Sequence, residues 1–187
     1  MRDVGAVPCS TSSMSTTSHP LRLVPVRHQD QAAAVVVHDD PSWAPFTFLY
    51  GYDPDGTWTG YMSWLADVRR GVGLGPSEVP ATFLLAWVDG ELVGRTSIRH
   101  ELNDYLEAYG GHVGYGVVAN HRRRGYATEV LRQSLVVARA AGVMDVLVTC
   151  DEDNVGSIRT IQRCGGVLDS IVEQSDGGPR KRRYWIR

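Results

Sequence analysis

The sequence predicts an α/β domain of the α+β type, with a mixed but mostly antiparallel sheet of about seven strands and four helices. Three patterns support this prediction: an apolar hairpin around Asp89-Gly90, a strand–helix–strand segment over residues 112–150, and a second hairpin over residues 166–186. Hairpins pair their strands antiparallel, whereas a strand–helix–strand unit pairs them parallel. The chain has 187 residues, enough for one domain with a full core, which we expect over residues 21–187.

The N-terminal part predicts a tail, an edge strand and a helix. Residues 1–19 are rich in Ser and Thr and lack apolar periodicity, so we expect a disordered tail, with Met14 as an alternative start. The run LRLVPV (21–26) alternates, and its proline fits an edge strand. Residues 28–40 then predict a helix that ends before Pro41.

An aromatic segment separates this helix from the next one. Residues 42–59 are punctuated by Pro and Gly and show no periodicity, which predicts a loop of the kind that often lines a binding site. Residues 61–70 have helical spacing. The glycines of GVGLGP (71–76) do not follow a strand, so they do not form a nucleotide-binding fingerprint.

The middle of the chain predicts a hairpin, a loop, a strand and a long helix. ATFLLAWV and ELVGRTSIRH flank Asp89-Gly90, a dipeptide typical of tight hairpin turns. After a loop at 103–111, HVGYGVV (112–118) predicts a glycine-interrupted strand. Apolar residues then recur with helical spacing from Ala127, and Gly142 ends the helix.

The C-terminal part predicts a buried strand, a capped helix and a hairpin. MDVLVTC (144–150) is apolar enough for a buried strand, and the helix after it places Val155, Ile158 and Ile161 on one face. GVLDSIVEQ and PRKRRYWI, joined by SDGG, predict the closing hairpin.

Composition and charge exclude several classes of protein. The formal net charge is −2, which argues against a general nucleic-acid-binding protein. No apolar run reaches the roughly 20 residues of a membrane helix, and the N-terminus lacks a signal-peptide core. The three cysteines include no CxxC pair, which argues against a disulfide framework or a zinc site. We therefore expect a cytoplasmic protein that binds neither nucleic acid nor membrane.

The turn NHRRRGYATEVL (120–131) has the features of an anion site. Backbone N–H groups at a helix N-terminus are unpaired, and the helix dipole adds roughly half a positive charge there. Gly125 lets the backbone approach a ligand closely, and Ala127 keeps the next turn small. Arginine adds bidentate contacts to phosphate. The spacing is neither GxGxxG nor the Walker pattern.

This turn resembles a known phosphate-binding loop. RRRGYA (122–127) matches the Q/R-x-x-G-x-G/A pyrophosphate loop of the GNAT N-acetyltransferase superfamily. DNVGSIRTIQRCGG resembles the motif N-x-x-A-x-x-x-Y-x-x-x-G-F of the same family, with Asn154, Ser157 and Gly165 matching. The element order matches the family over about residues 21–187. More narrowly, the chain is similar to a subgroup of predicted bacterial acetyltransferases whose acceptor is unknown.

The resemblance implies that acetyl-CoA binds as a cosubstrate and that no metal is required. Backbone groups of Tyr115, Gly116 and Val117 would bind the pantetheine arm as an added strand would. Asn154 and Ser157 would hold the same arm, although Asn154 also fits a plain helix N-cap. The pyrophosphate would lie on the amides of Arg122, Arg123, Arg124, Gly125, Tyr126 and Ala127.

The implied reaction is attack of an acceptor amine on the acetyl-CoA thioester. An N–H donor around Tyr115 would stabilise the oxyanion. The family usually protonates the leaving thiolate with a tyrosine, but Ile161 stands at that position. Tyr184 is our first candidate for the acid and Cys164 the second, unless the thiolate leaves unprotonated. Thr149 stands where some relatives carry a glutamate, and it cannot act as a base.

For the base we favour the place where RHELND and GGHVGY meet, if the two strands are antiparallel neighbours. His100 and Glu101 would then lie near His112, and His112 would act through water because Tyr115 is roughly 10 Å away along the strand. The pKa of histidine suits this role. Alternatively, His112 is a packed strand residue and Glu101 a loop carboxylate. A metal site at the two histidines lacks a third ligand with suitable spacing.

Two clusters have a functional and a structural interpretation. The RKRR run (180–183) could attract an acidic acceptor or the CoA 3′-phosphate, but we favour a solvated hairpin whose charges keep an edge strand from aggregating. The aromatic cluster is expected to be part core and part wall of the acceptor pocket, because the variable specificity of the family lies in this half. Its members are Trp43, Phe46, Phe48, Tyr50, Tyr52, Trp58 and Tyr61.

The leading expectation is an N-acetyltransferase that acts on a primary amine of a small molecule or peptide. One alternative is a non-catalytic acyl-CoA-binding or sensor domain, which the missing tyrosine favours. Another is an RNA- or DNA-binding module that uses the arginine turn, which the acidic balance disfavours. A homodimer is a further expectation, because this fold often pairs through sheet edges. The acceptor is not predicted, since its recognition is spread over loops.

Overall fold

Strands and helices follow one another in the predicted order within residues 20–44 and 46–187, the part that the computed structural model describes. The tail expected at 1–19, with Met14, lies outside the described residues. The α-helices are α1 (Gln31–His38), α2 (Trp58–Arg70), α3 (Tyr126–Ala140) and α4 (Val155–Arg163). The strands are β1 (Arg22–Pro25), β2 (Ala81–Val88), β3 (Glu91–Arg99), β4 (Val113–Val117), β5 (Val146–Asp151), β6 (Val167–Val172) and β7 (Lys181–Ile186).

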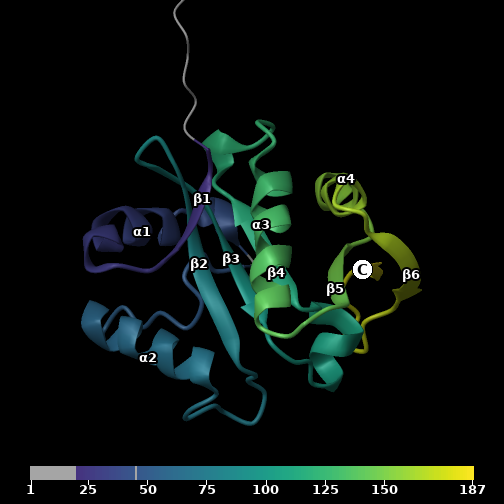
Figure 1. Cartoon of the computed structure of the whole chain (residues 1–187), viewed down its shortest axis with the longest axis horizontal. Helices are drawn as coiled ribbons and strands as arrows, with labels where there is room; N and C mark the ends of the chain where they lie inside the picture. The colour runs from purple at the N-terminus through teal and green to yellow at the C-terminus, as the bar shows by residue number, and fades with distance from the viewer. Residues whose placement is uncertain (1–19, 45) are drawn as a thin grey trace, which may run out of the picture.

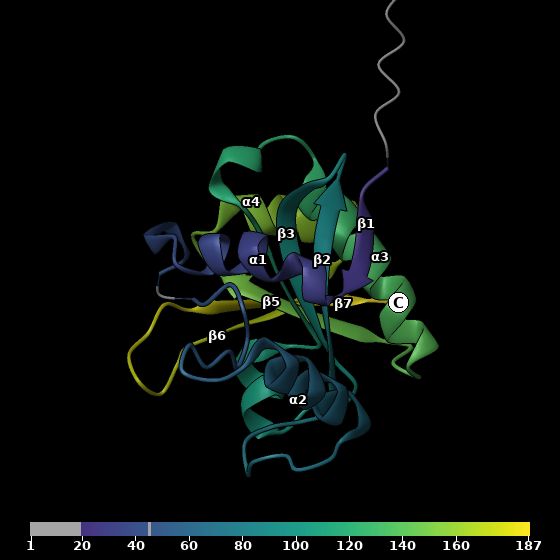
Figure 2. The same ribbon diagram turned by 90° about the vertical axis from the view of Figure 1, so that its left-hand side faces the viewer.

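The strands form two antiparallel sheets, with the orders β1-β2-β3-β4 and β5-β7-β6. Figures 1 and 2 show α1 and α2 against one face of the first sheet and α3 against the opposite face. Helix α3 connects β4 to β5, so the predicted crossover joins one sheet to the other. These features confirm the predicted fold class.

The hairpin around Asp89-Gly90 joins β2 to β3. Both turn residues have positive φ, 51° and 83°, as a two-residue type I′ turn requires. Strand β1 pairs only with β2, so Pro25 lies on an edge strand as predicted. Strand β2 is buried along almost its whole length, because helices cover both faces of its sheet.

Two apolar clusters make up most of the core. One lies between the first sheet, α3 and the second sheet and includes Leu131 and Tyr184. The other lies between α1, α2 and the first sheet and includes Phe48, Trp58 and Tyr61. Much of the aromatic segment therefore belongs to the core, as expected, and it fixes α2 against the sheet.

Local details of the prediction are wrong at three places. Helix α2 begins at Trp58, because the Thr57 side chain accepts a hydrogen bond from Gly60 N–H and caps it there. The expected loop at 103–111 contains a π-helical turn, Leu106–Gly110. Val155 is 54% exposed because it lies in the first turn of α4, outside the core cluster that Ile161 joins.

The interpretation of the RKRR run as an edge-strand guard is also wrong. Strand β7 is the central strand of its sheet, between β5 and β6. The cations pair with acids of neighbouring elements: Arg180 with Glu152 at 2.6 Å, Lys181 with Asp151, and Arg183 with Asp169 at 3.3 Å. The run therefore neutralises local acids and binds the second sheet together.

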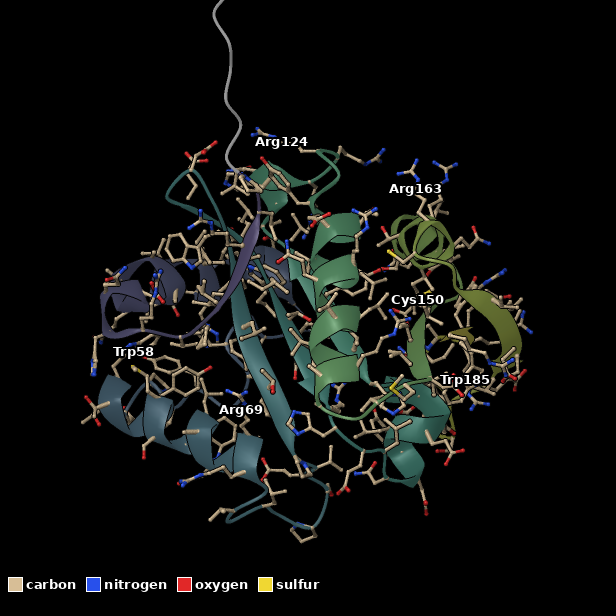
Figure 3. All side chains as sticks on the ribbon, viewed as in Figure 1. Trp58, Arg69, Arg124, Cys150, Arg163 and Trp185 are labelled. Atoms are coloured by element: carbon tan, nitrogen blue, oxygen red, sulfur yellow. The ribbon has the colours of Figure 1, made fainter. Side chains whose placement is uncertain are left out.

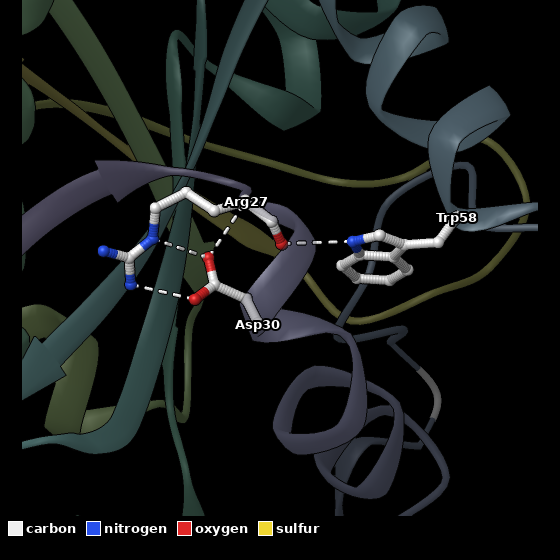
Figure 4. Close-up of polar contacts among 3 residues, drawn as sticks. All are labelled: Arg27, Asp30 and Trp58. Atoms are coloured by element: carbon white, nitrogen blue, oxygen red, sulfur yellow. Dashed lines mark hydrogen bonds and ion pairs between the residues drawn. The ribbon is translucent and has the colours of Figure 1, made fainter.

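A buried carboxylate fixes the chain between β1 and α1 (Figure 4). Asp30 is 1% exposed and accepts three hydrogen bonds from Arg27: from its backbone N–H at 2.8 Å, from Nε at 3.1 Å and from Nη2 at 2.8 Å. The carbonyl oxygen of Arg27 accepts from Trp58 Nε1 at 3.1 Å. The contact therefore orients the first residue of α2 as well.

We predict that Asp30→Ala lowers the free energy of unfolding by about 2–3 kcal/mol, because it removes a buried acceptor of several charged hydrogen bonds. Asp67→Ala is a matched control, since it removes an exposed i,i+3 partner of Arg70 and should cost less than about 1 kcal/mol. Urea unfolding of the two variants checks this. Equal losses would show that the Arg27–Asp30 contact is no stronger than a surface pair.

Candidate functional site

The two sheets meet at one point, where His112 precedes β4 and Leu147 lies in β5. The backbone N–H of His112 donates to the Leu147 carbonyl at 2.7 Å, and the Leu147 N–H donates to His112 Nδ1 at 2.9 Å. Gly111 allows this approach: its φ is 65°, and a Cβ there would lie 2.7 Å from the Leu147 carbonyl oxygen. Beyond this point β4 and β5 belong to separate sheets.

The edge of β4 that faces β5 carries backbone groups that pair with no other strand among the described residues. Arg99 N–H donates to the His112 carbonyl at 2.8 Å, and residues in an antiparallel pair alternate between facing the partner and facing away. The register between β3 and β4 is continuous, so the backbone amide and carbonyl of Gly116 face β3. The backbone groups of Tyr115 and Val117 face the other way, towards β5. The contribution of Gly116 to cofactor binding stays a prediction, although this register turns its backbone groups towards β3. Tyr115 and Val117 face the gap between β4 and β5.

The predicted anion turn lies between β4 and α3. Arg123 and Gly125 have φ of 64° and 83°, and no side chain caps the helix that starts at Tyr126. No described residue accepts from the backbone N–H groups of Arg124, Gly125, Tyr126 and Ala127. Figure 3 shows Arg124 on this loop, at the end of the molecule where α3 begins.

Arg122 differs from the other residues of this turn. Its backbone N–H donates to Ala119 at 3.2 Å, and its Nε donates to the Val117 carbonyl at 3.1 Å. Arg122 therefore ties the turn to the end of β4, and its amide is already bonded. The exposed amides from Arg124 onward remain the better anion ligands.

Helix α4 lies next to this gap through its first turns. The Asn154 side chain accepts from Ser157 N–H at 3.0 Å, so Asn154 is an N-cap in this structure. The Tyr115 side chain points towards the same helix. Burial raises the pKa of Tyr115 to about 12, against the smaller opposing influence of the nearby Ser157 and Thr160 hydroxyls. The Tyr115 hydroxyl nevertheless lacks a hydrogen-bond partner of normal geometry among the described residues.

The proposed base residues are only partly brought together. His112 is buried, and its Nδ1 lone pair is used by Leu147, as the alternative of a packed residue foresaw. Burial and the charge of Arg99 lower the pKa of His112, so the ring is held neutral. His100 turns towards β2, where its Nε2 lies 2.9 Å from Thr82 Oγ1. Glu101 is exposed in the following loop. The catalytic roles of His112 and Glu101 stay predictions.

The acid candidates occupy different environments. Tyr184 is 1% exposed, and its hydroxyl has no hydrogen-bond partner among the described residues. Ile161, at the position of the family tyrosine, is fully buried in the same cluster. Cys164 Sγ lies 3.6 Å from the Thr128 carbonyl, and burial raises the pKa of its thiol. Thr149 Oγ1 donates to the Tyr109 carbonyl at 2.6 Å and so fixes the π-helical turn.

The opposite face of β4 is covered by Trp43, a member of the expected aromatic cluster, and by two arginines that the sequence prediction missed. Trp43 lies on Gly116, where an added Cβ would come within 2.5 Å of its ring. The guanidinium groups of Arg95 and Arg99 lie over Gly114. The missed signal was two arginines four residues apart in one predicted strand, since that spacing places both on one face.

The described residues contain neither a membrane-spanning helix nor a metal-binding cluster. No helix there is long and apolar enough to cross a membrane. No group of three or more His, Cys, Asp or Glu side chains in that part of the chain could hold a metal ion.

Comparisons with known proteins agree on one family. The family model for the acetyltransferase (GNAT) domain matches residues 20–167. Mycobacterium smegmatis RimJ in complex with CoA-disulfide has a TM-score of 0.64 and 23% identity, over 90% of this chain and 86% of that one. An acetyltransferase from Agrobacterium tumefaciens has a TM-score of 0.59 and 21% identity, over 99% of both chains. YncA from Salmonella typhimurium, with its cofactor acetyl-CoA, has a TM-score of 0.59 and 16% identity, over 89% and 93%. No curated protein matches the chain significantly.

We predict that stability falls as the pH drops below about 6.5, the pKa of an unfolded histidine. The pKa of His112 is lowered in the fold, so protons bind the unfolded chain first and the stabilisation present above 6.5 is lost as the pH falls towards the folded pKa. His112→Asn keeps an acceptor but does not titrate, so urea unfolding between pH 5 and 8 should show a shallower fall.

The matched control is His28→Asn, which changes an exposed histidine and should keep the wild-type slope. Equal slopes in all three proteins would contradict the proton linkage of His112.

Proposed function

The chain belongs to the GNAT acetyltransferase family, and on this premise we propose that it is an acetyl-CoA-dependent N-acetyltransferase. It transfers the acetyl group to a primary amine of a small molecule or peptide by direct attack on the thioester. Among its structural neighbours, YncA binds acetyl-CoA and RimJ binds a CoA disulfide, which supports the choice of cosubstrate.

One observation carries this proposal: unpaired strand groups and unpaired helix amides lie on one continuous path. The path runs from Tyr115 on the open edge of β4 to the uncapped start of α3 at Tyr126. The pantetheine arm would extend the β4 edge, with Asn154 and Ser157 beside it, and the pyrophosphate would lie on the amides of the turn. The guanidinium groups of Arg123 and Arg124 would supply counter-charge.

The chemistry follows from this placement. The amine nitrogen forms a bond to the thioester carbonyl carbon, the C–S bond breaks, and the nitrogen loses a proton. The Tyr115 N–H, which faces the gap, would stabilise the oxyanion. The proton is taken by Glu101 or His112 through water, and His112 would first have to release Leu147.

The acid that protonates the leaving thiolate is proposed to be Tyr184, with Tyr115 as the second candidate. Both are buried hydroxyls without a partner among the described residues, and such groups usually find one in water or a ligand. Burial raises the pKa of Tyr115 to about 12, which keeps its proton in place until transfer.

We also propose where the protein is located and how it assembles. We propose a cytoplasmic protein, because its cosubstrate is made inside cells and the described cysteines Cys150 and Cys164 are free. A homodimer could form along β6, an edge strand with exposed apolar residues. These are Val167, Leu168 and Ile171.

A second candidate is a non-catalytic acyl-CoA sensor, which the buried Ile161 at the position of the family tyrosine favours. Release of free CoA thiol in the presence of an amine panel separates the two. Turnover above the rate of uncatalysed aminolysis excludes the sensor.

We predict that acetyl-CoA raises the free energy of unfolding by about 2.7 kcal/mol at a hundredfold excess over its Kd. The double variant Arg124→Glu, Gly125→Asp should lose most of this gain, because two carboxylates would then occupy the anion site. Arg139→Glu reverses one arginine charge, as Arg124→Glu does, but at the far end of α3, and should keep the gain. Thermal unfolding with and without acetyl-CoA checks this, and no gain in the wild type would end the proposal.

We predict that Tyr184→Phe lowers kcat by about 10²–10⁴, the contribution of a general acid, while the Kd for acetyl-CoA stays unchanged. Tyr115→Phe is the matched variant. If only Tyr115→Phe causes the loss, the acid is Tyr115, and if neither does, the thiolate leaves unprotonated.

A further inference from the structure

Two arginines of β3 converge on the face of β4 opposite α3. Strand residues 95 and 99 share a face, and the β3–β4 register places Gly114 between their partners. A Cβ built on Gly114 would lie 3.6 Å from Arg99 Nη1 and 3.8 Å from Arg95 Nη1. Because Gly114 has no side chain, both guanidinium groups can lie on the strand.

Neither cation has an acidic partner among the described residues. Arg95 donates only to the carbonyls of Gly114, at 3.4 Å, and Thr47, at 3.1 Å. Arg99 Nη1 donates to the carbonyls of Gly110, at 3.3 Å, and Gly111, at 3.1 Å. A guanidinium has five N–H donors, so each side chain keeps donors unused.

Burial and mutual repulsion make the charges of Arg95 and Arg99 unfavourable. Arg95 Nε is buried without a hydrogen-bond partner. Burial, followed by the charge of Arg99, lowers the pKa of Arg95 to about 10. Burial also lowers the pKa of Arg99. The nearest phenols, Tyr61 for Arg95 and Tyr50 for Arg99, are neutral at pH 7. Two partly buried like charges without an acid form a site that favours an anion.

This site adjoins the place where the acetyl group would be transferred. Gly114 is the neighbour in sequence of Tyr115, whose N–H faces the gap between β4 and β5. The α3 and α4 side of the gap holds the proposed CoA path. The arginines lie on the other side, under the aromatic segment whose Trp43 contacts Gly116. An acceptor that enters from this side meets the arginines beside the thioester.

We propose that Arg95 and Arg99 bind an anionic group of the acceptor, a carboxylate or a phosphate a few bonds from the reacting amine. This inference rests on the proposed acetyl transfer and narrows its substrate class to anionic amines. Paired guanidinium groups bind the oxygens of carboxylate and phosphate in bidentate geometry.

Matched acceptors test the proposal: glycine against glycinamide and phosphoethanolamine against ethanolamine, compared at equal concentrations of free amine. The wild type should show kcat/KM about 10- to 100-fold higher for the anionic members, the range expected for charged hydrogen bonds. Arg99→Gln should abolish this preference by lowering kcat/KM far more for the anionic members than for the neutral ones, and should keep the acetyl-CoA stabilisation. Arg99→Lys should keep part of the preference that Arg99→Gln loses, because lysine retains the positive charge but not the bidentate donor geometry of a guanidinium.

Arg22→Gln, on the exposed edge strand β1, is the control and should behave as the wild type. If Arg99→Gln lowers the rates for neutral and anionic amines equally, the arginines only brace the loops and the inference is overturned. Equal wild-type rates for both members of each pair overturn it as well. The better of the two anionic amines identifies the headgroup.

A binding measurement covers the case in which no amine is turned over. Glycine or phosphoethanolamine should then raise the thermal midpoint of the CoA-loaded wild type but not of Arg99→Gln. No difference between the two proteins overturns the anion site. If the wild type shows neither amine turnover nor a rise of its thermal midpoint with acetyl-CoA, the proposed function itself is overturned.

Discussion

The site depends on one short contact, the pair of hydrogen bonds between His112 and Leu147. A regular ladder would continue from this point and would pair β4 with β5 along their length. Instead the Nδ1 atom of His112 takes the place of a backbone acceptor, and Gly111 provides the close approach that this needs. The strands are therefore held at one end and left unpaired beyond it. The open backbone edge at Tyr115 is a direct consequence of this contact.

The open edge divides the molecule into two functional sides. On one side, α3 begins without a side-chain cap and the N-cap of α4 lies beside the gap, so backbone donors there suit the extended, phosphate-bearing ligand that we propose. On the other side, Trp43 from the segment before α2 covers Gly116 of β4, and the contacts of Arg27 with Asp30 and with Trp58 fix the start of α2 (Figure 4). The proposed transfer would bring its two substrates to β4 from these two sides.

Elements with strong periodicity or turn chemistry were predictable from the sequence. The hairpin at Asp89-Gly90, helix α3 and the glycine-containing turn before it all follow from local patterns. The position of β7 between β5 and β6 did not, because strand order within a sheet depends on partners that are distant in sequence. The use of the His112 lone pair and the convergence of Arg95 and Arg99 were likewise hidden. Both depend on register between strands, which composition and spacing do not encode.

Whether a cationic segment can bind an anion depends more on its acidic partners than on how many cations it contains. The RKRR run is the densest cationic segment near the C-terminus, yet each of its four cations pairs with Asp151, Glu152 or Asp169. Arg95 and Arg99 are four residues apart in strand β3, and neither pairs with an acid among the described residues. Burial makes an uncompensated charge more costly, so these two cations favour an anionic ligand more strongly than a solvated run can. A chain with a net charge of −2 can therefore still bind anions at the few places where its cations lack acids.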